Sequence, residues 1–176
     1  MDHEYLQYMT EADPVDFRGL MESYGQDVWD FAYVLTKSHH HSDDIFQEVF
    51  LKAYKNIASF HGKSSVRTWL IAITRNTAYN YMRSAFLRKV TLMDWISPKQ
   101  TSPSAEKEYF AQAVADDIWE MVLRLPAPFR EVLLLDAKYK MPLKDIAETL
   151  GVAEGTVKSR LYRARAKISR MLEEAD

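Results

Sequence analysis

Apolar residues along this chain recur every three or four positions, which is the spacing of one face of an α-helix. Val28, Phe31 and Leu35 follow this spacing in the first third of the sequence. No segment alternates apolar and polar residues as a half-buried β-strand would, and no internal repeat is present. The sequence therefore predicts an all-α fold.

The helical periodicity fails from Leu87 to Ser104, where Pro98 and Pro103 gather with serine and threonine. Such a composition is typical of a linker. A chain of 176 residues is long enough for two small domains. We therefore expect two small helical domains joined by a flexible linker, in an arrangement that the sequence does not fix. The predicted domains are residues 1–88 and 104–176, and the predicted linker is residues 89–103.

Several helix boundaries and inward faces can be predicted from cap chemistry and spacing. Ser42 is expected to cap a helix over residues 43–57, and Ser64 or Ser65 to cap the next one, over 65–84. A long helix is expected to begin near Pro103. The side chains predicted to face inward on it are Phe110, Val114, Ile118, Met121 and Leu125.

Composition excludes several classes of protein. The chain has no cysteine, so disulfides, thiolate zinc sites and cysteine nucleophiles are excluded. The N-terminus is acidic and leads into no apolar core, so we do not expect it to be a signal peptide. No stretch is long and apolar enough to span a membrane. We expect a soluble cytoplasmic protein.

Charge is segregated along the sequence. Residues 61–90 carry six Lys or Arg and no acid, and residues 138–171 carry nine Lys or Arg against three acids. Residues 1–60 are acidic, with eleven Asp or Glu against four Lys or Arg. Two basic blocks favour two separate contacts with a polyanion, and the acidic stretch favours a basic protein partner. The alternative is that each block is simply a solvated helix face.

The sharpest pattern lies near the C-terminus. A short helix with one apolar face, predicted over residues 142–150, is followed by a glycine-containing turn at 151–153. A longer basic helix is then predicted over 154–171. This order is typical of a DNA-binding helix-turn-helix.

The second of these helices has two distinct faces. At about 100° per residue, Val157, Leu161 and Ala164 fall on one side and are expected to pack on the domain. The opposite side is centred on Ser159 and carries cations and hydroxyls, which suit base edges and phosphates in a major groove. The residues predicted to contact duplex DNA are Lys144, Thr156, Lys158, Ser159, Arg160, Tyr162 and Arg163.

Two long segments resemble one protein family. The fourth conserved region of bacterial sigma factors of the extracytoplasmic-function group is similar to residues 125–168, LPAPFREVLLLDAKYKMPLKDIAETLGVAEGTVKSRLYRARAKI. The second region of that group resembles residues 42–83, SDDIFQEVFLKAYKNIASFHGKSSVRTWLIAITRNTAYNYMR. Asn80 departs from the Asp that many members carry. The resemblance implies a transcription initiation factor that binds core RNA polymerase and recognises the −10 and −35 promoter elements.

The first basic block suits single-stranded DNA. Its loop, Phe60 to Ser64, carries no acid and leads into a helix N-terminus, which attracts phosphate. The following helix interleaves cations with an aromatic residue. The cations can bind phosphates, and the aromatic ring can stack on an unstacked base. By the resemblance, the loop holds an extruded base of the −10 element. The residues assigned to the −10 element are Phe60, Gly62, Lys63, Ser64, Arg67, Arg75, Asn76, Tyr79, Asn80 and Arg83.

The acidic helix around residues 43–57 is the candidate protein-binding face. The resemblance assigns it to the largest subunit of RNA polymerase, and without the resemblance it is an ordinary amphipathic helix. The residues expected to bind polymerase are Asp43, Asp44, Gln47, Glu48 and Lys52. The family also implies an anti-sigma factor as a partner.

No motif supports catalysis, a cofactor or a metal by this chain, and His39–His41 is not expected to hold an ion. Two other functions stay open at this point. One is a stand-alone helix-turn-helix regulator with an N-terminal sensor or dimerisation domain. The other, an adaptor or anti-sigma-like protein without DNA contact, leaves both basic blocks unexplained.

Overall fold

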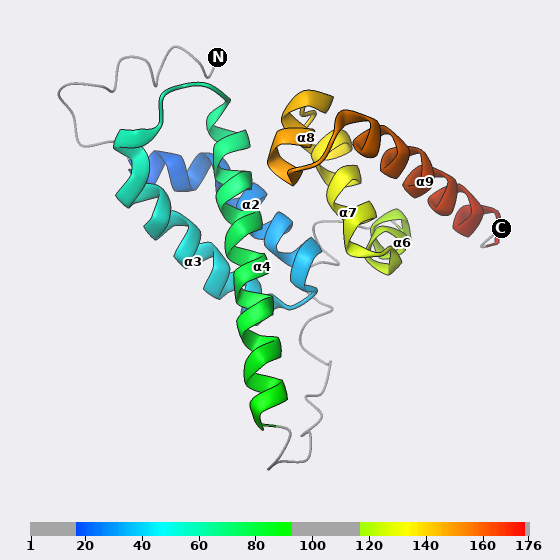
Figure 1. The fold of residues 1–176 in the computed structure, drawn as a ribbon, viewed down its shortest axis with the longest axis horizontal. Coiled ribbons are helices and arrows are strands. Elements are labelled where there is room, and N and C mark those ends of the chain that lie inside the picture. The colour runs from blue at the N-terminus through cyan, green and yellow to red at the C-terminus, as the bar shows by residue number, and fades with distance from the viewer. Residues whose placement is uncertain (1–16, 93–116, 175–176) are drawn as a thin grey trace.

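The computed structural model describes residues 17–92 and 117–174 of the chain. Within these ranges every regular element is helical and no strand occurs, which confirms the predicted all-α fold (Figure 1). None of the helices in this part of the chain is both long and apolar enough to cross a membrane. The elements are α2 (Phe17–Thr36), α3 (His39–Asn56), the 3₁₀ turn η2 (Ile57–Ser59), α4 (Val66–Leu92), α6 (Asp117–Arg124), α7 (Ala127–Leu133), the π-helical turn η3 (Leu134–Lys138), α8 (Leu143–Leu150) and α9 (Glu154–Glu173).

Helices α2, α3 and α4 pack against one another and form what we call the N-terminal bundle. Val28 and Phe31 of α2, Ile45 and Val49 of α3 and Leu70 of α4 are all fully buried. Each helix therefore contributes the apolar face that its three- and four-residue spacing predicts.

The N-terminus of α3 differs from the prediction. The helix begins at His39, and its cap is Ser38, whose Oγ accepts a hydrogen bond from the His41 N–H at 3.4 Å. Lys37, with a φ of 56°, reverses the chain after α2 and leaves Ser38 in the extended conformation that a cap needs. The prediction that Ser42 caps this helix was wrong. Ser42 is buried inside the helix, and its Oγ donates to the Ser38 carbonyl at 2.7 Å.

The start of α4 follows the prediction and its end lies further along than expected. Ser65 caps the helix, because its Oγ accepts from the Thr68 N–H at 3.1 Å. No proline or glycine interrupts residues 66–92, and the helix continues to Leu92, past the predicted end of the first domain. The rest of the predicted linker, and Phe110 and Val114, lie outside the described residues.

Helices α6, α7, α8 and α9, with η3, form the C-terminal bundle. Met121 of α6 and Leu125, directly after this helix, are buried, as their spacing predicts. Ile118, one turn earlier, was expected to face inward, and this was wrong, since it is 48% exposed. It lines an open pocket formed by residues of α6, α7, η3 and α9.

Helices α8 and α9 form the predicted helix-turn-helix. α8 ends at Gly151, which has a φ of 65°, and the Val152 N–H returns to the Ala147 carbonyl at 3.0 Å. This pair of features closes the helix and redirects the chain within three residues. Val157 and Leu161 of α9 are buried against the bundle, as the helical wheel predicts.

Two glycines at this turn are expected to respond oppositely to alanine. Gly151→Ala places a side chain at positive φ and should lower the free energy of unfolding by about 1 kcal/mol. Gly155→Ala, inside the first turn of α9, should raise it by about 0.5 kcal/mol, because alanine favours helix. A built Cβ meets nothing within 4 Å at either position, so crowding plays no part. Urea unfolding followed by circular dichroism measures both free energies of unfolding. A change in the same direction for the two variants would contradict the different backbone roles of Gly151 and Gly155.

The two bundles lie side by side and share one continuous core (Figure 1). Helix α2 contacts α7, and α4 contacts α8. Across the boundary, the ring of Phe31 meets the ring of Tyr139 edge-on, with centroids 6.1 Å apart. The structure thus supplies the arrangement of domains that the sequence left open.

Candidate nucleic-acid and polymerase interfaces

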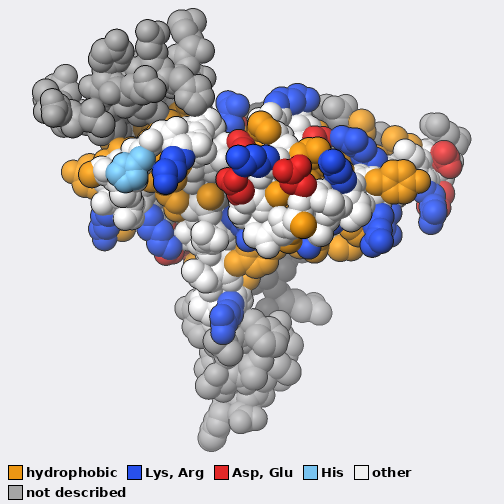
Figure 2. All heavy atoms as spheres, turned by 45° about the horizontal axis from the view of Figure 1, so that its top comes forward, with side chains coloured by type: hydrophobic (Ala, Val, Ile, Leu, Met, Phe, Trp, Pro, Cys, Tyr) orange, Lys and Arg blue, Asp and Glu red, His pale blue; other side chains and the backbone are white. Residues whose placement is uncertain are grey.

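The outer face of α9 carries most of the residues predicted to contact duplex DNA. Lys158, Ser159, Tyr162 and Arg163 are exposed, and Tyr162 reaches 77% exposure. The Ser159 Oγ donates to the Thr156 carbonyl at 3.0 Å, so its lone pairs are left to accept from a base. Figure 2 shows Lys and Arg side chains gathered over the half of the molecule that carries α8 and α9.

The remaining members of this set lie at its margins. Thr156 and Arg160 are half-buried, and Arg160 is close enough to Glu131 to act on its charge. Lys144, on α8, is exposed and lies 4.0 Å from the Glu148 carboxylate. The sequence therefore predicted the exposed face correctly in outline but did not show that Arg160 lies near Glu131 of α7.

The loop before α4 is accessible where the sequence predicted a contact with a DNA strand. Gly62 and Lys63 are exposed, and Gly62 has a φ of 66° with open space around it. Phe60 is half-buried against Trp69, with ring centroids 5.1 Å apart. Ser64 is also half-buried, and its Oγ donates to the Ser65 carbonyl at 3.3 Å.

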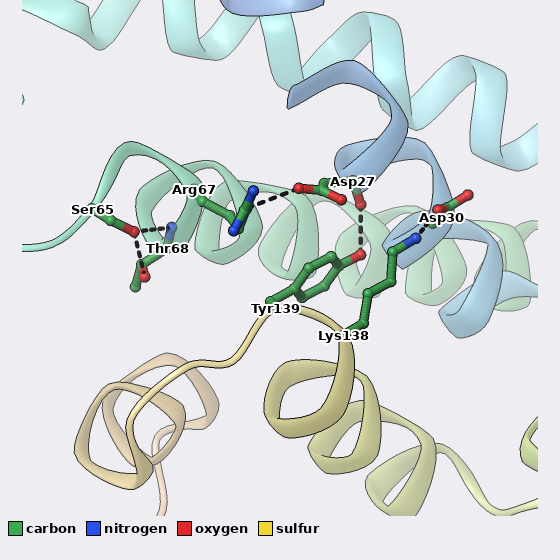
Figure 3. Close-up of polar contacts among 7 residues, drawn as sticks. All are labelled: Asp27, Asp30, Ser65, Arg67, Thr68, Lys138 and Tyr139. Carbon is green, nitrogen blue, oxygen red and sulfur yellow. Dashed lines mark hydrogen bonds and ion pairs between the residues drawn. The ribbon is translucent and has the colours of Figure 1, made fainter. Parts of the chain in front are cut away.

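On α4 the predicted residues divide into two groups. Asn76, Asn80 and Arg83 are exposed and follow the i, i+4, i+7 spacing of one stripe. Arg67 and Arg75 instead form ion pairs with other helices, although Arg67 itself stays exposed while Arg75 is half-buried. Arg67 Nε lies 2.9 Å from Asp27 Oδ2, as Figure 3 shows, and Arg75 Nε lies 3.0 Å from Glu131 Oε1.

Tyr79 belongs with the second group. It is half-buried, and the Arg75 guanidinium lies over its ring at 4.7 Å from the centroid. The Glu131 carboxylate lies close to its hydroxyl. Burial raises the pKa of Tyr79, and the neighbouring Glu131 charge raises it further.

Two charged residues of α7 near Arg75 and Tyr79 were not predicted as functional. Arg130 and Glu131 of α7 are 6% and 1% exposed. Burial lowers the pKa of Arg130 and raises the pKa of Glu131, while the Arg75 charge lowers that of Glu131. A buried charge needs a partner, so these two residues mark a structured contact and not a solvated surface. Their only sequence signal is adjacent charges within an apolar run.

The acidic face of α3 is largely engaged with its neighbours. Asp43 Oδ1 accepts from Trp29 Nε1 at 2.7 Å, and Asp44 Oδ2 accepts from the Tyr81 hydroxyl at 2.8 Å. Lys52 Nζ pairs with Glu48 at 2.6 Å and donates to Thr77 at 3.1 Å. Of the five residues predicted to bind polymerase, Asp43, Gln47 and Glu48 are exposed, and Asp44 and Lys52 are half-buried.

The same helix exposes two large apolar side chains that were not predicted. Leu51 is 53% exposed and Tyr54 is 62% exposed. With Gln47 they follow helical i, i+4, i+7 spacing, so they continue the acidic face toward the end of α3. Exposed apolar side chains beside charged ones are typical of a protein-binding surface.

Comparison with known proteins assigns the chain to a family. Residues 20–86 match Sigma-70 region 2, and residues 115–168 match Sigma-70, region 4. The RNA polymerase sigma factor SigZ of Bacillus subtilis is 30% identical, over 74% of this chain and 72% of its own length. The chain belongs to the sigma-70 family, in its extracytoplasmic-function group. The relatives of this sigma factor include SigW of Bacillus subtilis, an ECF RNA polymerase sigma factor that is 26% identical over 96% of this chain and 95% of its own length.

A solved structure agrees with this assignment. The sigma factor RpoE of Bartonella quintana, crystallised with the anti-sigma factor NepR, superposes with a TM-score of 0.69 and 27% identity. The match covers 90% of this sigma factor and 97% of RpoE. Our protein is therefore a transcription initiation factor that directs RNA polymerase to promoters. The presence of region 2 together with region 4 excludes the stand-alone regulator and the adaptor without DNA contact.

Proposed function

We propose that this sigma factor divides promoter recognition between its two bundles. Helix α9 reads the −35 element as duplex, and the loop of residues 60–64 with α4 captures the −10 strand. One observation supports this division above the others. Exposed cations lie on both candidate elements, Lys158 and Arg163 on the outer face of α9 and Lys63 and Arg83 on the loop before α4 and on α4, and the geometry of each element suits one form of DNA.

At the −35 element, the N-terminal half of α9 enters the major groove. Arg163 and Lys158 reach guanine edges, and Ser159 accepts from a base amino group. Tyr162 offers an exposed ring to a thymine methyl group or to the sugar. Lys144 and Thr156 contact phosphates at the edges of the groove, which fixes the register of the helix.

At the −10 element, a flipped base enters the loop that ends at Ser64. Gly62 allows the strand to approach the backbone closely, and the first N–H groups of α4 face a phosphate. The first turn of α4 contains no acid to oppose this. Asn76 and Asn80 hydrogen-bond to base edges along the exposed stripe, and Arg83 neutralises a phosphate.

Polymerase binds the exposed face of α3. Glu48 and Gln47 supply polar contacts, and Leu51 and Tyr54 supply the apolar centre that a stable interface requires. The nucleotidyl transfer chemistry belongs to the polymerase, so this protein is not itself an enzyme and acts in the cytoplasm with it. An anti-sigma factor is the proposed inhibitory partner, by similarity to the RpoE and NepR pair.

Transcription from a promoter library tests the proposal. Core RNA polymerase is incubated with the library with and without this protein, and the transcripts are sequenced. We expect a small set of start sites that appear only with the protein, each preceded by shared −35 and −10 sequences. Start sites that share only one of the two elements would contradict the division of labour between the bundles.

Reversing the charge of Glu48 tests the α3 interface. Glu48→Lys is expected to raise the Kd for core polymerase about tenfold or more. The new lysine would repel the basic partner surface that the acidic face of α3 is expected to contact. Fluorescence anisotropy of labelled protein titrated with core enzyme measures it. Glu173→Lys, an equal charge change at the far end of α9, serves as the control and should leave the Kd unchanged. An unaltered Kd for Glu48→Lys would place the interface elsewhere.

A further inference from the structure

A cavity of about 520 Å³ lies between α2 and α3 in the N-terminal bundle. Each helix contributes one face to it, because the lining residues within a helix are spaced three or four positions apart. The lining residues are Gly25, Gln26 and Trp29 of α2 and His39, Asp43 and Phe46 of α3. A volume of this size is typical of pockets that bind small ligands. None of the proposed DNA contacts falls in this cavity, and only Asp43 belongs to the proposed polymerase face.

Aromatic rings form one side of the cavity and hold one another in place. The ring of Trp29 stacks on Tyr33, with centroids 5.4 Å apart and planes 5° apart. The ring of His39 packs against both, at 5.0 Å from Trp29 and 4.9 Å from Tyr33. Trp29 is half-buried, so part of its ring remains accessible to a ligand. The face of an indole ring carries partial negative charge and attracts cations.

The polar groups of the cavity include two acceptors. Trp29 Nε1 donates to Asp43 Oδ1 at 2.7 Å, which places the carboxylate at the edge of the indole ring. A carboxylate has lone pairs on both oxygens, so Asp43 can still accept from a ligand. Among residues 17–92 and 117–174, no Lys or Arg side chain forms an ion pair with Asp43. Gln26 donates through Nε2 to Asp30 at 2.7 Å, which leaves its carbonyl oxygen as a second acceptor.

The glycine at position 25 sets the shape of the cavity. Gly25 is buried, and a Cβ built on it would lie 3.2 Å from Cε2 of Phe46. This distance is shorter than ordinary van der Waals contact, so an alanine would displace the Phe46 ring. Because both residues line the cavity, its shape depends on the absence of a side chain at position 25.

An aromatic ring beside a carboxylate that has no cationic partner suits a cation, and best a guanidinium. The guanidinium group is planar, stacks on aromatic rings and donates two parallel N–H groups to a carboxylate. It is also more weakly hydrated than an ammonium group, so less hydration is lost when it enters a cavity. An anion would be repelled by Asp43. An uncharged apolar ligand would cover the carboxylate without supplying a partner for its charge.

We infer that the cavity receives an arginine side chain of core RNA polymerase, with the guanidinium against the Trp29 ring and paired with Asp43. The inference rests on the proposed binding of polymerase to α3, because Asp43 lies on that face. Residues 1–60 carry eleven Asp or Glu against four Lys or Arg, which favours a basic partner surface. A buried arginine is a typical anchor of a protein interface. Trp29 and Gly25 thereby determine which partner side chain this face accepts.

The first part of the test measures the chemistry of the cavity in the full chain. The probe is N-acetylarginine amide, and its matched comparison is N-acetylcitrulline amide, in which an uncharged urea group replaces the guanidinium. The reporter is the indole N–H signal of Trp29 in a proton–nitrogen correlation spectrum, identified by its loss in Trp29→Phe. We expect only the arginine amide, at millimolar concentration, to shift this signal, because its charge perturbs the N–H that donates to Asp43. Asp43→Asn should abolish the shift, and Trp69, which does not line the cavity, should show none.

The second part measures binding to core polymerase by anisotropy. Asp43→Asn removes the charge and keeps the shape, whereas Gly25→Ala displaces Phe46 and changes no charge. Each should raise the Kd about tenfold. The two together should raise it little more than either alone, because both variants lose the same arginine contact. Glu173→Gln, which removes a carboxylate at the far end of α9, is the control and should leave the Kd unchanged. Circular dichroism checks that every variant keeps its helical content.

Two results would overturn the inference. One is an equal shift of the Trp29 signal by both amides, or by neither, because the cavity would then not select a guanidinium. The other is an unchanged Kd in Asp43→Asn and Gly25→Ala while Glu48→Lys raises it, which would leave polymerase on α3 but outside the cavity.

Failure of the proposed polymerase interface is recognised separately. In that case Glu48→Lys, Asp43→Asn and Gly25→Ala would all leave the Kd unchanged, although the arginine amide still shifts the Trp29 signal. That outcome would overturn polymerase as the source of the arginine together with the interface itself.

Discussion

Replacing Arg163 by Glu is expected to weaken binding to the −35 duplex by about 10- to 100-fold and to change the preferred base at one position. Arg163 is exposed on the outer face of α9 and makes no ion pair within the described residues. A groove-facing arginine carries about 1–3 kcal/mol of discrimination between bases. A carboxylate at the same point also repels the phosphates. Binding of the duplex identified by the promoter library, measured by anisotropy at fixed salt, gives the size of the loss.

A second arginine on the same helix supplies the control. Arg170→Glu changes the charge equally, but Arg170 lies about two turns further along α9, beyond the part that enters the groove. It should weaken all sequences to a similar, smaller extent and leave base preference unchanged. If both variants lowered affinity without altering preference, α9 would bind phosphate only, and the assignment of Arg163 to base recognition would be wrong.

Replacing Phe31 by Ala is expected to lower the free energy of unfolding by about 3–5 kcal/mol. Phe31 is fully buried in α2, at the point where the core of the N-terminal bundle continues to Tyr139 of the C-terminal one. Truncation removes the packing of the ring and leaves a cavity that rigid helices cannot close. Urea unfolding, followed by tryptophan fluorescence and by circular dichroism, measures the change.

An exposed residue of α3 provides the matched comparison. Leu51→Ala also truncates an apolar side chain, but at 53% exposure it should change stability by no more than about 0.5 kcal/mol. It should nevertheless weaken binding to core polymerase, because Leu51 lies on the proposed interface. A large loss of stability in Leu51→Ala, or a small one in Phe31→Ala, would contradict the division between core and surface described above.

The sequence by itself determined which segments are helical and which residues of α9 face outward. Helical spacing is a local property, so Val157 and Leu161 on one face and Ser159 and Arg163 on the other follow from positions a few residues apart. The turn at Gly151 follows equally from its freedom to adopt positive φ. The family resemblance likewise required only linear motifs, and the comparisons confirmed it.

Prediction from local sequence was wrong where the outcome depends on neighbouring parts of the chain. Ser38 and Ser42 both have the side chain of a helix cap, and only the reversal at Lys37 selected Ser38. Ile118 has the spacing of a core residue, but nothing in the described residues covers that turn of α6. In both cases the neighbours that decide the outcome are set by the path of the chain and not by the residue itself.

The tertiary structure alone decided which cations are available to a partner. Arg75 meets a carboxylate 56 positions away, and Arg130 meets a carbonyl 96 positions away. No periodicity links residues so far apart, because such pairs depend on how whole helices pack. Sequence could therefore assign Arg75 to a basic face but could not show that Glu131 already holds it. The physical reason is that the sequence states the chemical type of each side chain, whereas the residue that it contacts depends on how the helices of the two bundles pack.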